Sequence, residues 1–187
     1  MFKKYLTLAG VFSPPLVYGR LLLYFTGAYA VAGGNLNLGN YVLGLFALAA
    51  WLINASALDI YAKYEIDQRR GVGDSEGLIV LGVLRASHVQ VIIIASALGA
   101  LTFIAAYGFL APLLILVMLG ISYVSASPQL LIAHRPRVAT ALLPLGYVVL
   151  PLLLGSLAAA KYPSLLLLAL IVACYGQFAI SVSSSLK

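Results

Sequence analysis

Six long apolar stretches, separated by glycine, proline and polar residues, constrain this chain more than any other feature. They cover residues 14–33, 39–62, 87–108, 110–127, 137–157 and 163–186. A membrane-spanning helix needs about 20 predominantly apolar residues, whereas the strands of a membrane barrel alternate apolar and polar positions. These stretches do not alternate, and turn-forming residues mark their ends. We therefore predict about six membrane helices.

The composition excludes an ordinary soluble domain. Hydrophobic residues occupy 63% of the 187 positions and charged residues only 9%, whereas soluble domains carry about 25% charged residues. The expected fold class is all-α: a polytopic helical membrane protein with one transmembrane domain over residues 1–187. The net charge of +6 would suggest nucleic acid for a soluble protein. Here the basic residues lie at the ends of the spans, so we expect membrane lipid and anionic substrates as partners, and no nucleic acid.

The basic residues also predict an orientation. Lys161 is alone on one side of the six predicted spans. The basic residues on the other side are Lys3, Lys4, Arg69, Arg70, Arg85, Arg135, Arg137 and Lys187. Lysine and arginine favour the cytoplasmic side, so we expect a cytoplasmic N-terminus and a cytoplasmic loop over about residues 68–86. That loop is polar and rich in glycine, which indicates a binding loop or, alternatively, a flexible linker.

The acidic residues gather in one short segment at and after the end of the second predicted span. The chain has five acidic residues, which are Asp59, Glu65, Asp67, Asp74 and Glu76. A charged side chain near the centre of a membrane helix costs roughly 2.5–3.5 kcal/mol on insertion scales, so carboxylates at the end of an apolar helix usually serve a function. We expect this cluster to hold cations.

Three charged residues of the second span share one helical face. Asp59, Lys63 and Asp67 are spaced i, i+4, i+8, which displaces successive members by about 40° around the helix and about 6 Å along it. Each carboxylate can contribute to a Mg²⁺ that is otherwise coordinated by water and substrate phosphates. Alternatively, Lys63 only pairs with the two carboxylates, as i, i+4 ion pairs do on many helices. The spacing alone leaves both interpretations open.

Three segments of the sequence indicate a function more specifically than the spacing of the charged residues does. The first is Asp59-Ile-Tyr-Ala-Lys-Tyr-Glu-Ile-Asp67, and the second contains Gly82 and Ser87. The third is Tyr123-Val-Ser-Ala-Ser-Pro128, followed by His134-Arg135-Pro136. In order and spacing they resemble three segments of the UbiA superfamily of intramembrane prenyltransferases. These are the first aspartate-rich motif, commonly Asn-Asp-x-x-Asp-x-x-x-Asp, the Pro-Ser-Gly-x-x-Ser segment, and the Tyr-Ser-x-Pro-Pro and basic segment after the fourth helix.

The resemblance implies a bundle of nine membrane helices around a central cavity, of which six spans cover roughly the first two thirds. Two aspartate-rich motifs of the family bind Mg²⁺ and a prenyl diphosphate, and the prenyl group passes to a lipid-soluble or aromatic, hydrophobic acceptor. On this basis Asp59 and Asp67 are the expected Mg²⁺ ligands, and the catalytic group is not identified. The expected contacts to the diphosphate are Lys63, Arg69, Arg70, Asn54, Tyr123 and Arg135.

The sequence departs from the family pattern in two places. Asp59, Ile60 and Lys63 stand where the motif has Asn, Asp and Asp, so only Asp67 matches a ligand directly. The sequence ends at Lys187, about where the second motif of the family begins, so we expect it to be incomplete at the C-terminus. Ile60 and Lys63 favour one alternative, a non-catalytic family member that acts as a lipid-binding or assembly subunit. A small transporter is a third interpretation, but no inverted repeat supports it.

Several residues also have purely structural interpretations. Arg20, early in the first span, either extends to the membrane interface or points into the cavity at an anionic substrate. Asn54 either contacts substrate or bonds a neighbouring helix, and Tyr123 is either an interfacial aromatic or a substrate contact. In the fifth span, the prolines and glycines predict kinks and close helix packing; they are Pro144, Gly146, Pro151 and Gly155.

Overall fold

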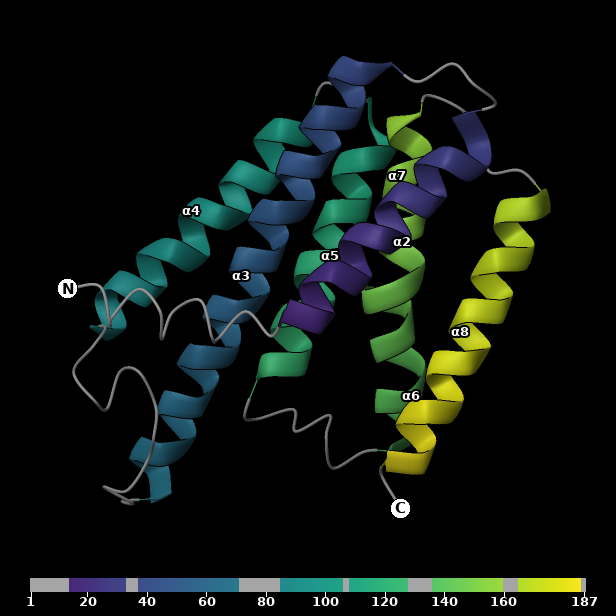
Figure 1. The fold of residues 1–187 in the computed structure, drawn as a ribbon. Coiled ribbons are helices and arrows are strands. Elements are labelled where there is room, and N and C mark those ends of the chain that lie inside the picture. The colour runs from purple at the N-terminus through teal and green to yellow at the C-terminus, as the bar shows by residue number, and fades with distance from the viewer. Residues whose placement is uncertain are drawn as a thin grey trace.

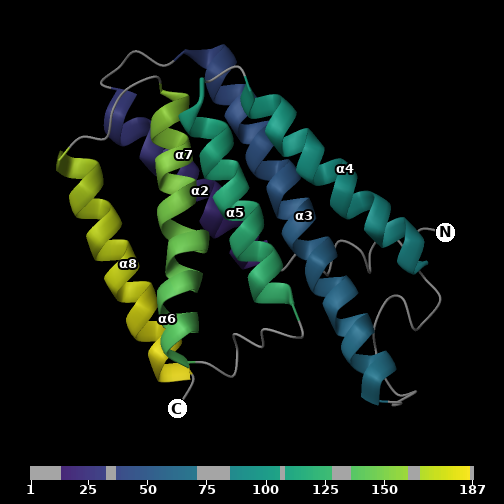
Figure 2. The ribbon, with the colours of Figure 1, turned by 180° about the vertical axis from the view of Figure 1, so that it is seen from behind.

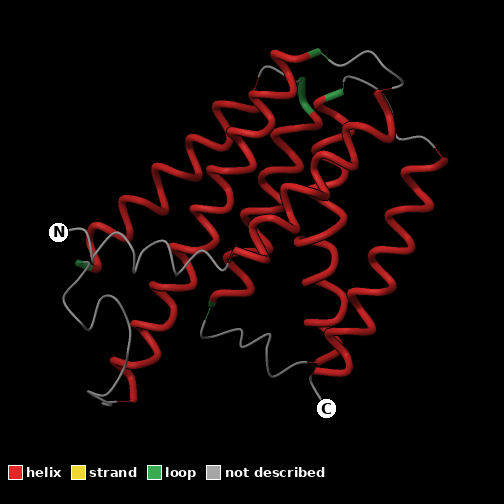
Figure 3. Tube along the Cα trace, viewed as in Figure 1, coloured by secondary structure: helices red, strands yellow, loops and turns green. Residues whose placement is uncertain are grey.

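The computed structural model describes residues 14–32, 37–70, 85–105, 108–127, 136–159 and 165–185. The elements are α2 (Pro14–Ala32), α3 (Leu38–Arg70), α4 (Ala86–Ile104), α5 (Leu110–Ala126), α6 (Pro136–Pro144), η3 (Leu145–Val149), α7 (Leu150–Ala158) and α8 (Leu165–Ser185). Figures 1 and 3 show that all regular structure in these ranges is helical. The predicted all-α class is confirmed.

The helices coincide with the six predicted stretches to within a few residues at most ends. The fifth stretch is one continuous helical rod made of α6, η3 and α7. The main difference is at the end of α3, which continues to Arg70 instead of ending at residue 62. The last turns contain Glu, Gln and Arg, which have high helix propensity, so the helix extends past its apolar part. The predicted loop over residues 68–86 therefore begins only after Arg70, and residues 71–84 lie outside the described part.

Length and composition support a membrane protein. Three helices within the described ranges are long and apolar enough to cross a membrane: Leu38–Ile66, Ala86–Ile104 and Val138–Ala158. Leu110–Ala126 and Leu167–Ser181 are shorter apolar helices. On α4, the exposed side chains Val91, Ile94 and Leu98 form an apolar strip at helical spacing, as expected for a surface in contact with lipid rather than water. The chain is an integral membrane protein.

The helices pack as a single bundle. Helix α3 lies along α4, α2 lies along α7, and α5 contacts both α3 and α7. Helix α8 packs against α6 and η3 at one edge of the bundle, and the two opposite views in Figures 1 and 2 show this arrangement. The core between the helices contains the fully buried side chains of Trp51, Tyr24, Leu48, Ile104 and Met118.

Glycines allow α2 and α7 to approach closely. A Cβ atom added at Gly27 would overlap the backbone of Leu152, and one added at Gly155 would overlap the backbone oxygen of Tyr24. Each glycine thus faces the backbone of the other helix. Small residues at such interfaces let membrane helices gain dispersion contacts without a hydrophobic driving force. The close packing predicted at Gly155 is confirmed.

The helical rod made of α6, η3 and α7 changes its pitch after Pro144. The residues from Leu145 to Val149 form a π-helical turn, which follows a proline that has no N–H to donate within the helix. Gly146 lies in this turn, and a Cβ there would lie 2.7 Å from Cγ2 of Ile121 on α5. The predicted irregularity takes the form of a π turn, and this turn carries Tyr147.

A polar contact fixes α3 against α4. The side-chain amide Nδ2 of Asn54 donates to the backbone oxygen of Ile93 at 2.7 Å and to Oγ of Ser96 at 3.2 Å. Asn54 is only 2% exposed. Interhelical hydrogen bonds of this kind in membrane bundles contribute about 0.6 kcal/mol on average and up to about 1.7 kcal/mol.

Replacing Gly155 by alanine should destabilise the bundle by about 1–3 kcal/mol, because the added methyl group forces the backbones of α2 and α7 apart. Thermal unfolding in detergent, followed by circular dichroism, measures the change. Gly120→Ala in α5 is the matched control, since a Cβ there meets nothing within 4 Å. Equal unfolding temperatures for the two variants would contradict the close approach.

Asn54→Ala should lower the unfolding free energy by about 1 kcal/mol, because it removes both bonds from α3 to α4. Titration with a denaturing detergent measures it. Thr102→Ala removes a hydroxyl that bonds only Leu98 of its own helix, and we expect it to cost less. If Asn54→Ala is no more harmful than Thr102→Ala, the interhelical bonds do not stabilise the pair.

Candidate functional site

The C-terminal half of α3 presents polar and charged side chains on two faces. One face looks toward α5 and lines a cavity of about 180 Å³ with Leu58, Tyr61, Ala62 and Glu65. The other face carries Asp59 and Lys63. An α-helix turns about 100° per residue, so the second face lies roughly a third of a turn away from the first.

On the second face, Asp59 and Lys63 form an ion pair. The Lys63 Nζ and the Asp59 Oδ2 are 2.8 Å apart, and the two side chains are 67% and 58% exposed. An exposed i, i+4 pair of this kind contributes only about 0.3–0.5 kcal/mol. The pair therefore leaves the Asp59 carboxylate accessible to a stronger competitor, such as a divalent cation. The predicted pairing of these two residues is confirmed.

Asp67, Arg69 and Arg70, which the sequence predicts for the same site, lie farther along the helix. The backbone of Asp67 is helical and one turn beyond Lys63, so its position continues the register of Asp59 and Lys63. Arg69 and Arg70 are the last residues of α3. The side chains of these three residues lie outside the described part of the structure, as does all of Arg135. Their proposed contacts remain predictions.

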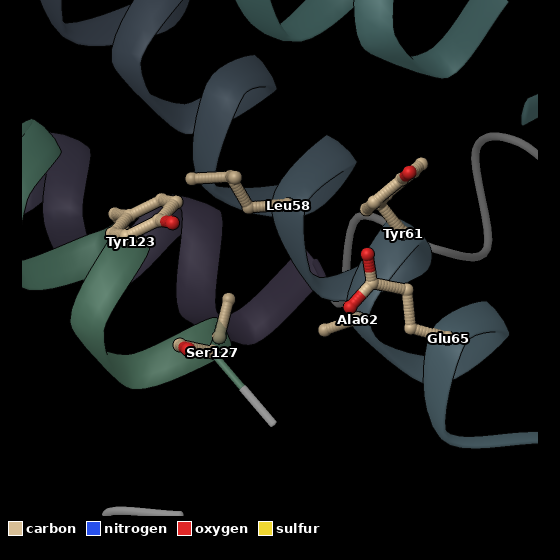
Figure 4. A pocket seen from close by; sticks show the side chains of 7 residues that line it. Leu58, Tyr61, Ala62, Glu65, Tyr123 and Ser127 are labelled. Atoms are coloured by element: carbon tan, nitrogen blue, oxygen red, sulfur yellow. The ribbon is translucent and has the colours of Figure 1, made fainter. Parts of the chain in front are cut away.

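The face toward α5 holds a polar cavity that the sequence did not predict. Helix α5 and the residue after it contribute Tyr123, Ala126 and Ser127. Figure 4 shows the carboxylate of Glu65 turned toward the space that Tyr123 and Ser127 border. Glu65 lies one turn after Tyr61 and two turns after Leu58, so the three residues share one helical face. This spacing would have predicted Glu65 in the cavity if the packing of α5 on that face had been known.

Tyr61 and Tyr123 differ in how they are held. The Tyr61 hydroxyl accepts a hydrogen bond from Nε2 of Gln90 on α4, at 2.8 Å. Tyr123 is 62% exposed at the end of α5. Its position fits an exposed aromatic at a helix end, and it also lines the cavity beside Glu65, whereas its contact with substrate stays a prediction.

Asn54 bonds a neighbouring helix. Its amide is bonded to Ile93 and Ser96 of α4, and its side chain is buried. The amide nitrogen of Asn54 already donates to two acceptors on α4, so it has no proton left for a diphosphate in this arrangement, and its contact with substrate stays a prediction. The structural alternative is the one observed.

The guanidinium of Arg20 lies against two aromatic rings of the bundle. Its guanidinium carbon lies 4.1 Å from the ring centroid of Tyr147 and 5.1 Å from that of Trp51. Both rings belong to the interior of the bundle, so the side chain points inward from α2. Cation–π contacts of this kind stabilise a partly desolvated guanidinium by about 1–2 kcal/mol.

No preformed metal centre is visible in the described residues. Within them, no three His, Cys, Asp or Glu side chains come together around a common point. A site on α3 therefore has to be completed by water, by substrate oxygens or by ligands from elsewhere.

Comparison with known proteins identifies the fold. No family model and no curated protein matches the sequence. Among solved structures, a UbiA homolog from Archaeoglobus fulgidus bound to DMAPP and Mg²⁺ aligns with a TM-score of 0.66 and 23% sequence identity, over 88% of this chain and 59% of that one. Another structure of a UbiA homolog from the same organism aligns with a TM-score of 0.60 and 21% identity, over 88% of this chain and 57% of that one.

The chain thus spans less than two thirds of the length of these two proteins. The likeness extends over 88% of this chain in both cases. The resemblance that the three sequence segments suggested is confirmed at the level of the fold: this chain folds as the UbiA homologs do.

Proposed function

We propose that the protein is an intramembrane prenyltransferase, and that the C-terminal end of α3 forms one half of its site for Mg²⁺ and a prenyl diphosphate. One observation carries the proposal. A chain with the fold of a UbiA homolog bound to DMAPP and Mg²⁺ has a carboxylate, Asp59, on an open face near the end of the apolar part of α3.

The donor set fits a partly hydrated Mg²⁺. Asp59 and Asp67 are about 12 Å apart along the helix, so they do not share one ion. Each supplies one oxygen to a separate ion, since Mg²⁺ keeps several waters and takes its remaining ligands from substrate phosphates. The exposed pair of Asp59 with Lys63 opposes this only weakly.

The basic residues of this end recognise the diphosphate. Lys63 lies between the two carboxylates on the helix and contacts a phosphate oxygen as a point charge. Arg69 and Arg70 follow on the last turn, Tyr123 lies at the end of α5, and we assign the same role to Arg135, which comes after it in the sequence. These side chains neutralise the charge that develops on the leaving diphosphate, and bound Mg²⁺ adds to that neutralisation.

The apolar bundle supplies the remaining conditions for the reaction. Hydrocarbon side chains surround the prenyl group and keep water away from its allylic carbon, which carries positive charge as the diphosphate leaves. A hydrophobic acceptor then attacks that carbon, as in a step of lipid or quinone biosynthesis. We place the N-terminus and the end of α3 on the cytoplasmic side, where a soluble diphosphate head has access.

A second role is favoured by a specific contact. Lys63 occupies a position where the family motif has a metal-binding aspartate, and it neutralises Asp59. A positive charge there opposes binding of a divalent cation. This observation favours a non-catalytic member of the family, which binds lipid or takes part in assembly.

Asp67→Asn and Asp59→Asn, each made in the full-length protein, should weaken Mg²⁺-dependent binding of farnesyl diphosphate at least about tenfold, a loss of about 1.4 kcal/mol. Equilibrium binding with and without EDTA measures it. Glu65→Gln is the control, because it alters the α5-facing side of the helix instead. If Glu65→Gln removes the Mg²⁺ dependence and Asp67→Asn does not, the assignment of the site is wrong.

The double variant Ile60→Asp, Lys63→Asp separates the two roles, because it restores the family's carboxylates and removes the competing charge. We expect Mg²⁺ to bind about tenfold more tightly, which isothermal titration measures directly. Prenyl transfer that appears or increases in this variant identifies a weakened enzyme. A folded variant with tighter Mg²⁺ binding and no transfer supports the non-catalytic role.

A further inference from the structure

Arg20 is a charged residue without an ionic partner inside an apolar bundle. Its guanidinium is stacked on Tyr147 and Trp51, and its Nε is buried with no hydrogen-bond acceptor among the described residues. No carboxylate of the described ranges pairs with it either. An arginine within a membrane bundle is costly unless it is paired, and such residues commonly mark a substrate or ion site.

A cavity opens directly beside this guanidinium. It measures about 480 Å³, which is within the range of about 300–1,000 Å³ typical of small-molecule sites, and lies between α2, the π turn and α8. Its lining is apolar except for Arg20 and the Tyr147 ring; the other residues are Gly19, Leu22, Leu23, Leu143, Val148 and Phe178. The cavity thus combines one fixed cation with a hydrocarbon wall.

The π turn orients one wall of this cavity. Tyr147 lies within the turn from Leu145 to Val149, and its ring covers one side of the guanidinium at 4.1 Å. Single π turns inside helices occur often at functional sites, because the extra residue per turn redirects a side chain. The rings hold the planar group of Arg20 in place, so binding at its remaining edge costs little side-chain entropy.

We propose that this cavity binds a single-chain amphipathic anion, whose carboxylate or phosphate head lies on Arg20 and whose hydrocarbon part lies against α2, the π turn and α8. The head group supplies the missing acceptor for Nε and neutralises the guanidinium, which binds such oxyanions through paired N–H groups. The hydrocarbon part replaces water against the apolar wall.

The proposed site is distinct from the one at the end of α3. Trp51, which lies under Arg20, precedes Asp59 by two helical turns, or about 12 Å of rise, and faces the bundle interior. Binding at Arg20 requires neither Mg²⁺ nor a diphosphate. The two proposals therefore stand or fall separately.

Trp51 is the only tryptophan of the chain, so its fluorescence reports on this cavity. The 187-residue chain, in neutral detergent with EDTA, is titrated with dibromostearic acid, because bromine atoms quench an indole only at close range. The neutral monoglyceride of the same acid is the control ligand. We expect the acid to quench Trp51 at a concentration at least tenfold lower than the neutral ester does.

Competition identifies the head group. Dodecyl phosphate and dodecanoate are each added to the complex with the brominated acid, with dodecanol as the neutral control. Recovery of fluorescence by the phosphate alone, by the carboxylate alone, or by both assigns the preferred oxyanion. Recovery by dodecanol at the same concentration overturns the proposal, since charge would then play no part.

Two variants test the contact with Arg20 and the volume of the cavity independently. Arg20→Gln should remove the preference for the acid, whereas Arg85→Gln, which removes an exposed cation before α4, should retain it. Gly19→Phe should abolish quenching with Arg20 intact, because a Cβ at Gly19 meets nothing within 4 Å and its ring enters the cavity. Preferential quenching by the acid that persists in Arg20→Gln, or undiminished quenching in Gly19→Phe, overturns the proposal.

Discussion

The indole of Trp51 is the contact on which the interior of the bundle depends, because it joins α3 to three other segments. Its Nε1 donates to Oγ of Ser122 on α5 at 3.0 Å, its ring lies 6.2 Å from that of Tyr147 on η3, and it supports Arg20 from α2. A buried indole N–H without an acceptor is costly. The bond to Ser122 therefore fixes the position of α3 relative to α5, and with it every residue farther along α3.

With α3 fixed in this way, one of its sides borders a cavity and another is open. The side of α3 that follows Trp51 toward α5 carries Leu58, Ala62 and Glu65 and closes a small polar cavity with Tyr123. The side with Asp59 and Lys63 stays open. The open side is the one on which we propose that a divalent cation binds, since metal ions and phosphates bring their own water and oxygen ligands.

The structure also shows how an apolar bundle accommodates a charge that faces inward. Arg20 is placed between two aromatic rings rather than next to a carboxylate. All acidic residues of the chain lie between Asp59 and Glu76, so no acid on its own helix can pair with it. Aromatic faces stabilise the cation in part, and the adjacent cavity leaves room for an anion to complete its neutralisation.

The sequence alone determined the helices, the membrane environment and the register of Asp59 with Lys63, because all three depend on local periodicity and composition. It also pointed to the fold through three short segments. It did not determine which way Arg20, Asn54 and Glu65 point. The residues next to each of them in the sequence do not fix the direction of its side chain. Only the packing of α2, α4 and α5 against α3 decides whether the side chain contacts an aromatic ring, a backbone carbonyl or a cavity.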